Sequence, residues 1–528
     1  MRKLVFGLLI LVSVVVNAQL RPDTYKFENG RIGKIAADSP ISNSILDIAI
    51  DGSDIWLGTS RGLSYSADLG ATWKNYYQDE TFGEESITAI GVYNGVVYAS
   101  TGHSTERNGE SLPEGSGIKI STDGGNTWIS RPQPVDDPAD SSVQYGINTL
   151  RALPVTVEIN NIVYDMAFTP GTIWIVTFAG GLRKSTDLGE TWQRVVLPPD
   201  NIDYLHPDST YSFSLQPVAG GFGSESYLNH RVFSVAAAGD NVIYVGTAGG
   251  INKGTILADG NIVWQKSTRT NQDEPISGNF VTALSYDENT NSVWGATWLA
   301  EGTTEYYGVS ASFDGGLSWK VFLSGEKAHN FGFVPKISGS NIFTDIMAAT
   351  DNGLFRSADF GNSWFTPQNI IDVTNGNTLK TDKYYSASAL NFSGLRYVFL
   401  GSAEEGLIKL EESGSMWSGD WYILTASEKI VAEDNTYAFP NPFSPSQERV
   451  RIKYLNNSSS TVTIRILDFG MNLVKTVIQN ADRLQGVEHT DYWDGRDEFG
   501  SVVANGVYFY RIDFGDSDPV YGKIMVLR

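Results

Sequence analysis

Short runs in which β-branched and aromatic residues alternate with small or polar ones recur along most of the chain. Residues 44–50, 55–59 and 62–65 are three such runs in succession, with Asp-Gly and Ser-Arg between them. Apolar runs of this length between turn residues are typical of β-strands joined in antiparallel hairpins. The pattern therefore predicts an all-β chain.

A phrase of the form Ser-x-Asp-x-Gly-x-Thr/Ser-Trp follows the third run and returns four more times along the chain. The Asp can fold its carboxylate onto the amides of its own turn, and the Gly accepts a positive φ without a Cβ penalty. We predict a structural role for these aspartates, which are Asp68, Asp123, Asp187, Asp314 and Asp359. The Trp that closes each phrase is a large apolar anchor suited to wedging between neighbouring sheets.

Two more units keep the strand pattern without the phrase, at residues 242–247 and 397–402. One Trp then marks each unit: Trp73, Trp128, Trp192, Trp264, Trp319, Trp364 and Trp421. Spacings of 45 to 72 residues between these markers suit four-stranded blades with insertions. The sequence predicts a seven-bladed β-propeller over residues 19–425.

The five phrases resemble the Asp-box, or BNR, repeats of sialidase-type propellers, across residues 40–425. The resemblance implies that each Asp turn joins the third and fourth strands, on the face away from the ligand. Asp-box propellers include sialidases, xyloglucan-cleaving enzymes, sorting receptors and photosystem assembly factors, so the fold is indicated more sharply than the function. The alternative for the aspartates is a surface Ca²⁺ site, which needs more oxygen ligands than the phrase supplies; no other cofactor is expected.

The pattern changes after a polar linker at residues 426–437. Alternating runs at residues 450–454, 462–467 and 506–512 predict a small β-sandwich over residues 438–528. This segment resembles the immunoglobulin-like domain of flagellar hook-capping proteins and the sorting domains of type IX (Por) secretion substrates. The motifs that carry the resemblance are Pro-Asn-Pro-Phe (residues 440–443), Trp-Asp-Gly-Arg-Asp (493–497), Gly-Val-Tyr (506–508) and the closing residues 522–528. The resemblance implies the secretion machinery as a partner. An ordinary accessory sandwich is the alternative.

The chain ends and composition set further bounds. Residues 1–18 carry Arg2-Lys3, an apolar run and a small-residue cleavage site, which predicts a signal peptide and a secreted or cell-surface protein; a retained anchor helix is the alternative. The absence of cysteine excludes disulfides, thiolate catalysis and thiolate zinc sites. A net charge of −22 argues against a broad basic surface for nucleic acid or anionic membranes.

The long insertions, residues 101–116, 132–160, 197–230, 298–307 and 366–384, all follow a second or a fourth strand. A propeller places such loops on one face, where recognition commonly occurs. Candidate ligand-binding residues for a glycan or an extracellular protein are Tyr204, His206, Tyr211, Tyr227, Trp298, Tyr306, Arg107 and Arg231. The alternative is that these aromatic residues form small cores within their own loops.

Carboxylates on this face would serve a glycoside hydrolase if two of them met across a sugar. The candidates are Glu106, Glu110, Glu114, Asp136, Asp137, Asp140, Asp200, Asp203, Asp208, Glu225, Glu301 and Glu305, and Asp136, Asp137 and Asp140 are also a candidate cation site.

Sialidase chemistry also needs an arginine triad and an Arg-Ile-Pro motif; Arg31-Ile32-Gly33 is the nearest match, and nothing marks a triad. Xyloglucan-cleaving relatives use a cleft between two propellers, and one is expected here. We therefore predict an exported, non-catalytic binding propeller with unknown catalytic residues. The alternatives are a glycoside hydrolase and a structural cell-envelope or adhesion component.

Overall fold

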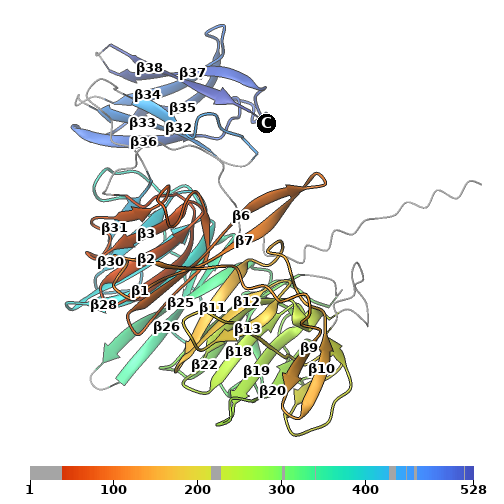
Figure 1. Cartoon of the computed structure of the whole chain (residues 1–528). Helices are drawn as coiled ribbons and strands as arrows, with labels where there is room; N and C mark the ends of the chain where they lie inside the picture. The colour runs from red at the N-terminus through yellow and green to blue at the C-terminus, as the bar shows by residue number, and fades with distance from the viewer. Residues whose placement is uncertain are drawn as a thin grey trace, which may run out of the picture.

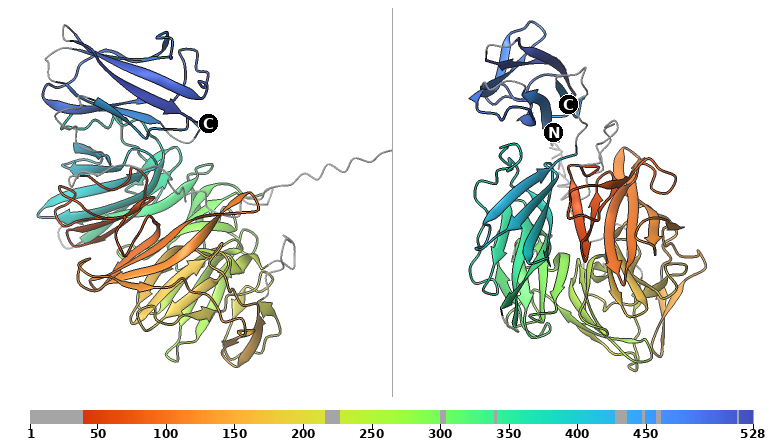
Figure 2. Two further views of the ribbon diagram at one scale, coloured as in Figure 1. Left: turned by 45° about the horizontal axis from the view of Figure 1, so that its top comes forward. Right: turned by 90° about the vertical axis from the view of Figure 1, so that its left-hand side faces the viewer.

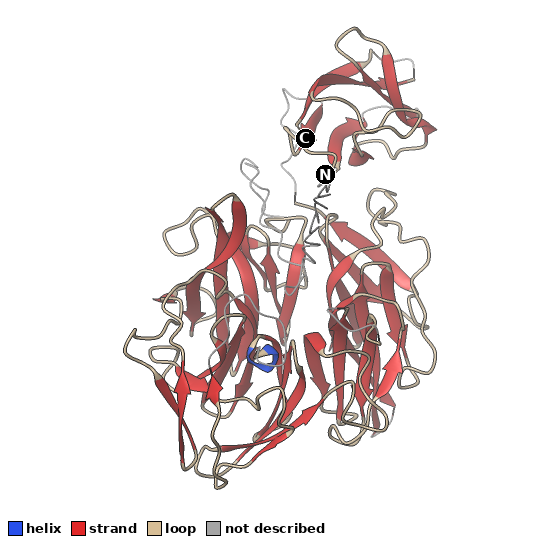
Figure 3. Ribbon diagram, turned by 90° about the vertical axis from the view of Figure 1, so that its right-hand side faces the viewer, coloured by secondary structure: helices blue, strands red, loops and turns tan. Residues whose placement is uncertain are grey.

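The computed structural model describes residues 39–215, 227–299, 304–338, 341–426, 436–446, 449–456, 461–515 and 518–527. The predicted signal segment and most of the predicted linker lie outside these residues. Within them the protein is built from β-strands, with one short 3-10 helix, η1 (Leu228–His230) (Figure 3). In the same residues no helix has the length and apolar character needed to cross a bilayer.

Consecutive antiparallel strands form a series of sheets, which we number as blades in chain order. Blade 1 contains β1 (Ile45–Asp51), β2 (Asp54–Thr59), β3 (Gly62–Ser66) and β4 (Lys74–Tyr76); blade 2 contains β5 (Ser86–Tyr93), β6 (Val96–Arg107), β7 (Glu110–Ser121) and β8 (Ile129–Arg131); blade 3 contains β11 (Val163–Thr169), β12 (Thr172–Thr177), β13 (Gly181–Ser185) and β14 (Gln193–Val195). Blade 4 contains β17 (Val232–Ala237), β18 (Val242–Thr247), β19 (Gly250–Ile256) and β20 (Ile262–Ser267); blade 5 contains β21 (Phe280–Asp287), β22 (Ser292–Trp298), β23 (Gly308–Ser312) and β24 (Lys320–Phe322). Blade 6 contains β25 (Ala328–Ser338), β26 (Asn341–Thr350) and β27 (Gly353–Ser357), and blade 7 contains β28 (Tyr384–Phe392), β29 (Leu395–Ser402), β30 (Leu407–Glu412) and β31 (Gly419–Leu424).

The first strand of each blade contacts the first strand of the next, and β28 returns to β1 (Figure 1). This radial ring is a β-propeller. Within the described residues no strand is exchanged between blades 7 and 1, and packing together with a short N-terminal segment joins these blades. The Asn43 side chain accepts a hydrogen bond from the Ala426 amide (2.8 Å), and its carbonyl accepts one from the Gly406 amide (2.8 Å).

Each repeated Asp binds its own turn. In blade 1 the Asp68 carboxylate accepts hydrogen bonds from the Ser66 hydroxyl (2.8 Å) and from the amide (2.8 Å) and hydroxyl (2.6 Å) of Thr72. Asp123, Asp187, Asp314 and Asp359 do the same in their turns. Hydrogen bonds from Thr127 lower the pKa of Asp123 to about 2, and those from Thr191 lower that of Asp187 to about 2.

The Trp at the end of each turn packs on the preceding blade. Trp128 lies edge-on to Trp56 of blade 1, with ring centroids 6.1 Å apart, and Trp364 lies edge-on to Trp294 of blade 5 at 6.2 Å. Trp73 shares a core cluster with Phe399 of blade 7. These contacts link neighbouring sheets around the ring.

The C-terminal residues form a separate sandwich of two sheets that share one core (Figure 2). One sheet contains β32 (Thr436–Phe439), β33 (Val450–Asn456) and β36 (Val487–Trp493), and the other contains β35 (Leu473–Ala481), β34 (Val462–Leu467), β37 (Gly506–Phe514) and β38 (Val520–Val526). The sandwich meets blade 7 where Glu405 Oε1 lies 3.8 Å from Arg449 Nη1. Glu405 belongs to the connection between β29 and β30.

Candidate functional site

The antiparallel order of each blade divides the ring into two ends. Connections between strands 1 and 2 and between strands 3 and 4 leave from the end that carries the Asp turns, which we call the turn end. Connections between strands 2 and 3, and from strand 4 to the next blade, leave from the opposite end, the insertion end. All the long insertions leave the blades there, but parts of residues 132–160 and 197–230 extend along the outer edge of the ring beside β20 (Figure 1). The C-terminal sandwich follows β31 from the insertion end.

Several insertions are themselves ordered structure. The hairpin of β6 and β7 continues past the blade to Arg107, and β9 (Ser142–Tyr145), β10 (Asn148–Ala152) and β16 (Ser214–Leu215) form a sheet of their own. The strand β15 (Tyr204–Leu205) pairs with the outer strand of blade 4. The insertion end is therefore a framework on which side chains can be held in fixed positions.

A buried ion pair anchors the insertion at residues 132–160. Asp136 Oδ1 lies 2.7 Å from Arg183 Nη1 of blade 3, and Asp136 Oδ2 accepts a hydrogen bond from the Val155 amide (2.7 Å). Asp136 is thus paired with a guanidinium, whereas Asp137 and Asp140 are exposed. Among the described residues no three His, Cys, Asp or Glu side chains lie where they would hold a metal ion.

Three of the predicted aromatic residues belong to the packing of the insertions. Trp298 is 4% exposed, and its indole N–H donates to the Ala328 carbonyl (2.6 Å). Tyr227 is buried in the same core cluster, and the half-buried Tyr211 packs against it. This cluster also contains Phe233, Trp264 and Phe280 of blades 4 and 5, so Trp298 and Tyr227 pack with the blades themselves.

The other predicted residues are more accessible. Tyr204 is 54% exposed, and its ring stacks at 6.5 Å on that of His206. Tyr204 also lines an open cavity of about 1100 Å³ at the outer edge of blade 4. Tyr306 is half-buried beneath Arg269, Arg231 lies over the Phe178 ring, and Arg107 is exposed at its hairpin tip. The structure brings Tyr204, His206 and Tyr211 together, because the His206 amide donates to the Tyr211 hydroxyl (2.9 Å).

The insertion carboxylates also have local partners. Asp200 accepts hydrogen bonds from the amides of Leu228 (2.9 Å) and Asn229 (2.8 Å), and Glu114 Oε2 lies 3.7 Å from His103 Nε2. Asp203 lies 3.7 Å from the buried Lys266 ammonium. Glu225 and Glu301 are outside the described residues.

Sequence reasoning missed a group of exposed apolar side chains on the insertion at residues 132–160. Ile147 is 65% exposed, and Leu153 and Val157 are about half exposed. Their signal in the sequence is an apolar residue among polar and proline neighbours, without the alternation that marks a strand.

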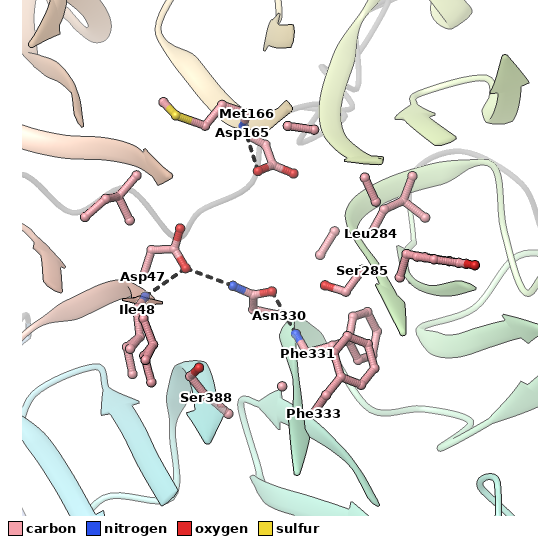
Figure 4. Close-up of a pocket in the computed structure, with 18 of the residues that line it drawn as sticks. Asp47, Ile48, Asp165, Met166, Leu284, Ser285, Asn330, Phe331, Phe333 and Ser388 are labelled. Carbon is pink, nitrogen blue, oxygen red and sulfur yellow. Dashed lines mark hydrogen bonds between the residues drawn. The ribbon is translucent and has the colours of Figure 1, made fainter. Parts of the chain in front are cut away.

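Sequence reasoning also missed the central channel, a cavity of about 1010 Å³ between the first strands of all the blades (Figure 4). Each of these strands has a register shift near its start. Such bulges free backbone amides from the ladder. Asp47 Oδ1 accepts from the Ile48 amide (2.9 Å), and Asp165 accepts from the amides of Met166 (2.8 Å) and Val235 (2.9 Å).

Burial raises the pKa of both channel aspartates, to about 6 for Asp47 and about 8 for Asp165. Asn330 Nδ2 donates to Asp47 Oδ1 at 3.2 Å, but none of the residues that line the channel is Lys or Arg. The signal in the sequence is a single Asp within an apolar strand. It was missed because one polar residue among apolar ones is also the usual alternation of a strand with one exposed face.

A series of buried rings follows the wall of the channel at the insertion end, from blade 3 to blade 7. The rings of Tyr164, Phe233, Phe280, Trp298, His329 and Tyr385 follow one another edge to face, with centroids 4.9 to 6.2 Å apart. Residues at the ends of the first hairpins, among them Tyr93, Tyr286 and Glu288, line the channel at the turn end.

Comparison with known proteins found no matching family model and no matching curated protein. Among solved structures, the chain is similar to PorZ, described as an essential bacterial surface component of the type-IX secretion system of Porphyromonas gingivalis, with 14% identity and a TM-score of 0.29. That match covers 92% of this chain and 66% of the PorZ chain, so the chain spans slightly less than two thirds of it. YCF48 from Cyanidioschyzon merolae has 15% identity over 70% of this chain and 96% of its own, with a TM-score of 0.40. An ancestral GH74 enzyme has 14% identity over 92% of this chain and 72% of its own, with a TM-score of 0.32.

Proposed function

We propose that this chain is an exported, non-catalytic recognition protein that binds a glycan or an extracellular protein through the insertion end of its propeller. In this proposal residues 19–425 are a seven-bladed Asp-box propeller, and an immunoglobulin-like domain at residues 438–528 serves secretion or attachment to the cell surface. The mature protein would act outside the cell, after removal of residues 1–18.

The observation that supports this proposal is the asymmetry of the ring. Every long insertion leaves the ring at one end, whereas the connections at the other end are short turns. Loops held by a rigid scaffold are the usual place for recognition, because their ordering entropy has already been lost on folding. Paired strands and the buried ion pair between Asp136 and Arg183 hold these insertions.

The exposed side chains of the insertions, several of them along the outer edge of blade 4, suit a binding surface. Tyr204 offers a ring that can stack on a sugar or a partner side chain, and Ile147, Leu153 and Val157 add apolar area. Of the predicted binding residues, Tyr204, His206, Tyr306, Arg107 and Arg231 remain in the proposal. Trp298, Tyr227 and Tyr211 support the surface from beneath.

The carboxylate contacts favour binding over hydrolysis. A glycosidase needs two carboxyl groups facing each other across the scissile bond. At the insertion end Asp136 is paired with Arg183, and Asp200 binds two backbone amides.

The test is a glycan array together with affinity capture of extracellular proteins by the full mature chain. Tyr204→Ala and Ile147→Asp should each weaken binding of the captured ligand by about tenfold or more, because exposed anchors carry much of the binding energy. Phe499→Ala, at a 93% exposed ring of the sandwich, is the matched control and should leave binding unchanged. Equal binding by all variants would place the site elsewhere, and turnover of a sialoside or β-glucan would contradict the non-catalytic assignment.

A further inference from the structure

The central channel is a pocket distinct from the insertion end. Its walls are the first strands of the blades, with the buried rings from Tyr164 to Tyr385 along the insertion end. Tyr93 and Tyr286 line its turn end. Its volume of about 1010 Å³ would hold a small molecule or a long side chain.

The side chains of this channel that can carry charge are mostly acidic. Asp47 and Asp165 lie in its wall and Glu288 at its mouth, and among the described residues its lining contains no Lys or Arg. Asn330 donates one N–H to Asp47, while its own oxygen accepts from the Phe331 amide (2.8 Å). The ionised forms of these carboxyl groups therefore have no matching cation in the described lining.

His329 gives independent evidence at the insertion end of the channel. Its side chain is 1% exposed, and Nε2 lies 2.6 Å from Asp351 Oδ1, so Nε2–H donates to that carboxylate. Burial lowers the pKa of His329, so the ring is neutral at pH 7 and Nδ1 is an acceptor. Within the described part of the chain Nδ1 has no hydrogen-bond partner, which is costly for a buried polar atom.

The remaining walls are apolar and aromatic. Phe331 and Phe333 lie beside Asn330, and Ile48 and Met166 flank the two aspartates (Figure 4). Such walls accept methylene groups, and ring faces attract an ammonium. The combination of acceptors, negative charge and an apolar tube matches a linear aliphatic cation.

We propose that the channel binds a linear aliphatic amine, either a free polyamine or the side chain of a lysine on a partner. The ammonium lies between Asp47 and Asp165, and the methylene chain runs along the apolar wall. A second ammonium, where present, reaches Glu288 at the mouth. This site is separate from the proposed recognition surface and does not depend on it.

The titration of the channel supports the proposal. With no cation present, burial holds the pKa of Asp165 at about 8 and that of Asp47 at about 6. A bound ammonium favours both ionised forms, so binding near pH 7 should release protons and should strengthen as the pH rises from about 6 to about 8.5. The other titratable groups facing the channel are Glu288, His329, Tyr93, Tyr164, Tyr286 and Tyr385.

The first experiment is calorimetry of the full mature chain with cadaverine, with the matching diol, and with a blocked tripeptide whose central residue is lysine. Cadaverine should bind with proton release, and the diol should bind at least about tenfold more weakly, because it lacks the charge. Binding of the tripeptide as well would identify a partner lysine as a ligand, and binding of cadaverine alone would identify a free polyamine. Absence of amine binding, or equal binding of the diol, would overturn the proposal.

Variants separate the channel from the acidic surface of the protein. Asp165→Asn should weaken cadaverine binding about tenfold, whereas Asp51→Asn, the same change at an exposed hairpin, should not. Ser388→Lys places an ammonium inside the channel, so it should abolish cadaverine binding and raise the melting temperature at pH 8 relative to Ser388→Met. Unchanged binding in both Asp165→Asn and Ser388→Lys would overturn the proposal even if one of them were unstable.

Discussion

The interface between blades 6 and 7 and the central channel both contain buried carboxylates. Those at the interface are paired with arginines, whereas those in the channel are not. Glu412 is fully buried and receives hydrogen bonds at 2.6 Å from Arg356 and from Arg396. Burial raises the pKa of Glu412, but these two guanidinium groups outweigh that effect and hold it below its usual value. Asp47 and Asp165 have no cationic partner, and burial raises their pKa values.

The comparison shows that a neighbouring positive charge, more than burial, decides whether the pKa of a buried carboxyl group in this protein is lowered or raised. At the interface Arg356 joins Glu412 of blade 7 to Asp345 of its own blade, so the charges tie two sheets together. In the channel the carboxylates hold bulge amides but remain uncompensated. The carboxylates at the interface already have their counter-ions, whereas the proposed amine would supply one to the carboxylates in the channel.

The largest expected effect comes from breaking the interface network. Arg356→Met should lower the free energy of unfolding by about 3–5 kcal/mol, because it leaves Glu412 and Asp345 buried with less compensation. Urea unfolding at pH 7 measures this effect. Arg396→Met is the control: its side chain is 22% exposed, so its loss should be smaller. A loss below about 1 kcal/mol for Arg356→Met would show that the network carries little energy.

Removing a channel charge should have an effect that depends on pH. At about pH 5, where Asp165 is protonated, Asp165→Asn should cost about 1–2 kcal/mol. The backbone N–H groups of Met166 and Val235 donate to different carboxyl oxygens, and the NH2 group of Asn cannot accept from either. The folded pKa of Asp165 is about 8, above its unfolded value, so the wild-type protein loses stability from this group as the pH rises from about 4 through 8.

The variant lacks this loss. Its deficit should therefore shrink or reverse by about pH 9, measured by urea unfolding at both pH values. A deficit that stays constant or grows with pH would contradict the raised pKa and weaken the contrast with Glu412.

The Asp turns provide an intermediate case, in which exposed carboxylates are stabilised by hydrogen bonds alone. Asp68→Ala should cost about 1 kcal/mol, because the Thr72 amide and the Ser66 hydroxyl lose their acceptor. Thr72→Val, which removes one donor, should cost less. The pKa of Asp68 is lowered, so its contribution should be lost as the pH falls below about 4, opposite in sign to Asp165. Thermal melts from about pH 2 to pH 7 measure this, and an effect that does not depend on pH would contradict it.

The smallest effect on stability is expected at the recognition surface. Tyr204→Ala should change the free energy of unfolding by no more than about 0.5 kcal/mol, since the side chain is exposed and outside both charge networks. Thermal melts test this alongside the binding assay. A large loss of stability would mean that Tyr204 is a packing residue, like Trp298.

Much of the strand structure could be predicted from the sequence because its determinants are local. The runs at residues 242–247 and 462–467 coincide with β18 and β34. The hydrogen bonds of Asp68 within its own turn follow from the same short phrase. Burial of Trp298 could not be predicted in this way, because it depends on the Ala328 carbonyl of the next blade.

The sequence by itself determined the antiparallel strands, the repeated Asp turns and the end of the ring from which each long insertion leaves, since alternation and turn chemistry act over a few residues. Only the tertiary structure decided which side chains meet. Asp47, Asp165 and Asn330 come from three blades and converge because the ring brings strand starts together, with register shifts that turn them to the axis. Their pKa values depend on surroundings assembled from all the blades, and no local pattern specifies those surroundings.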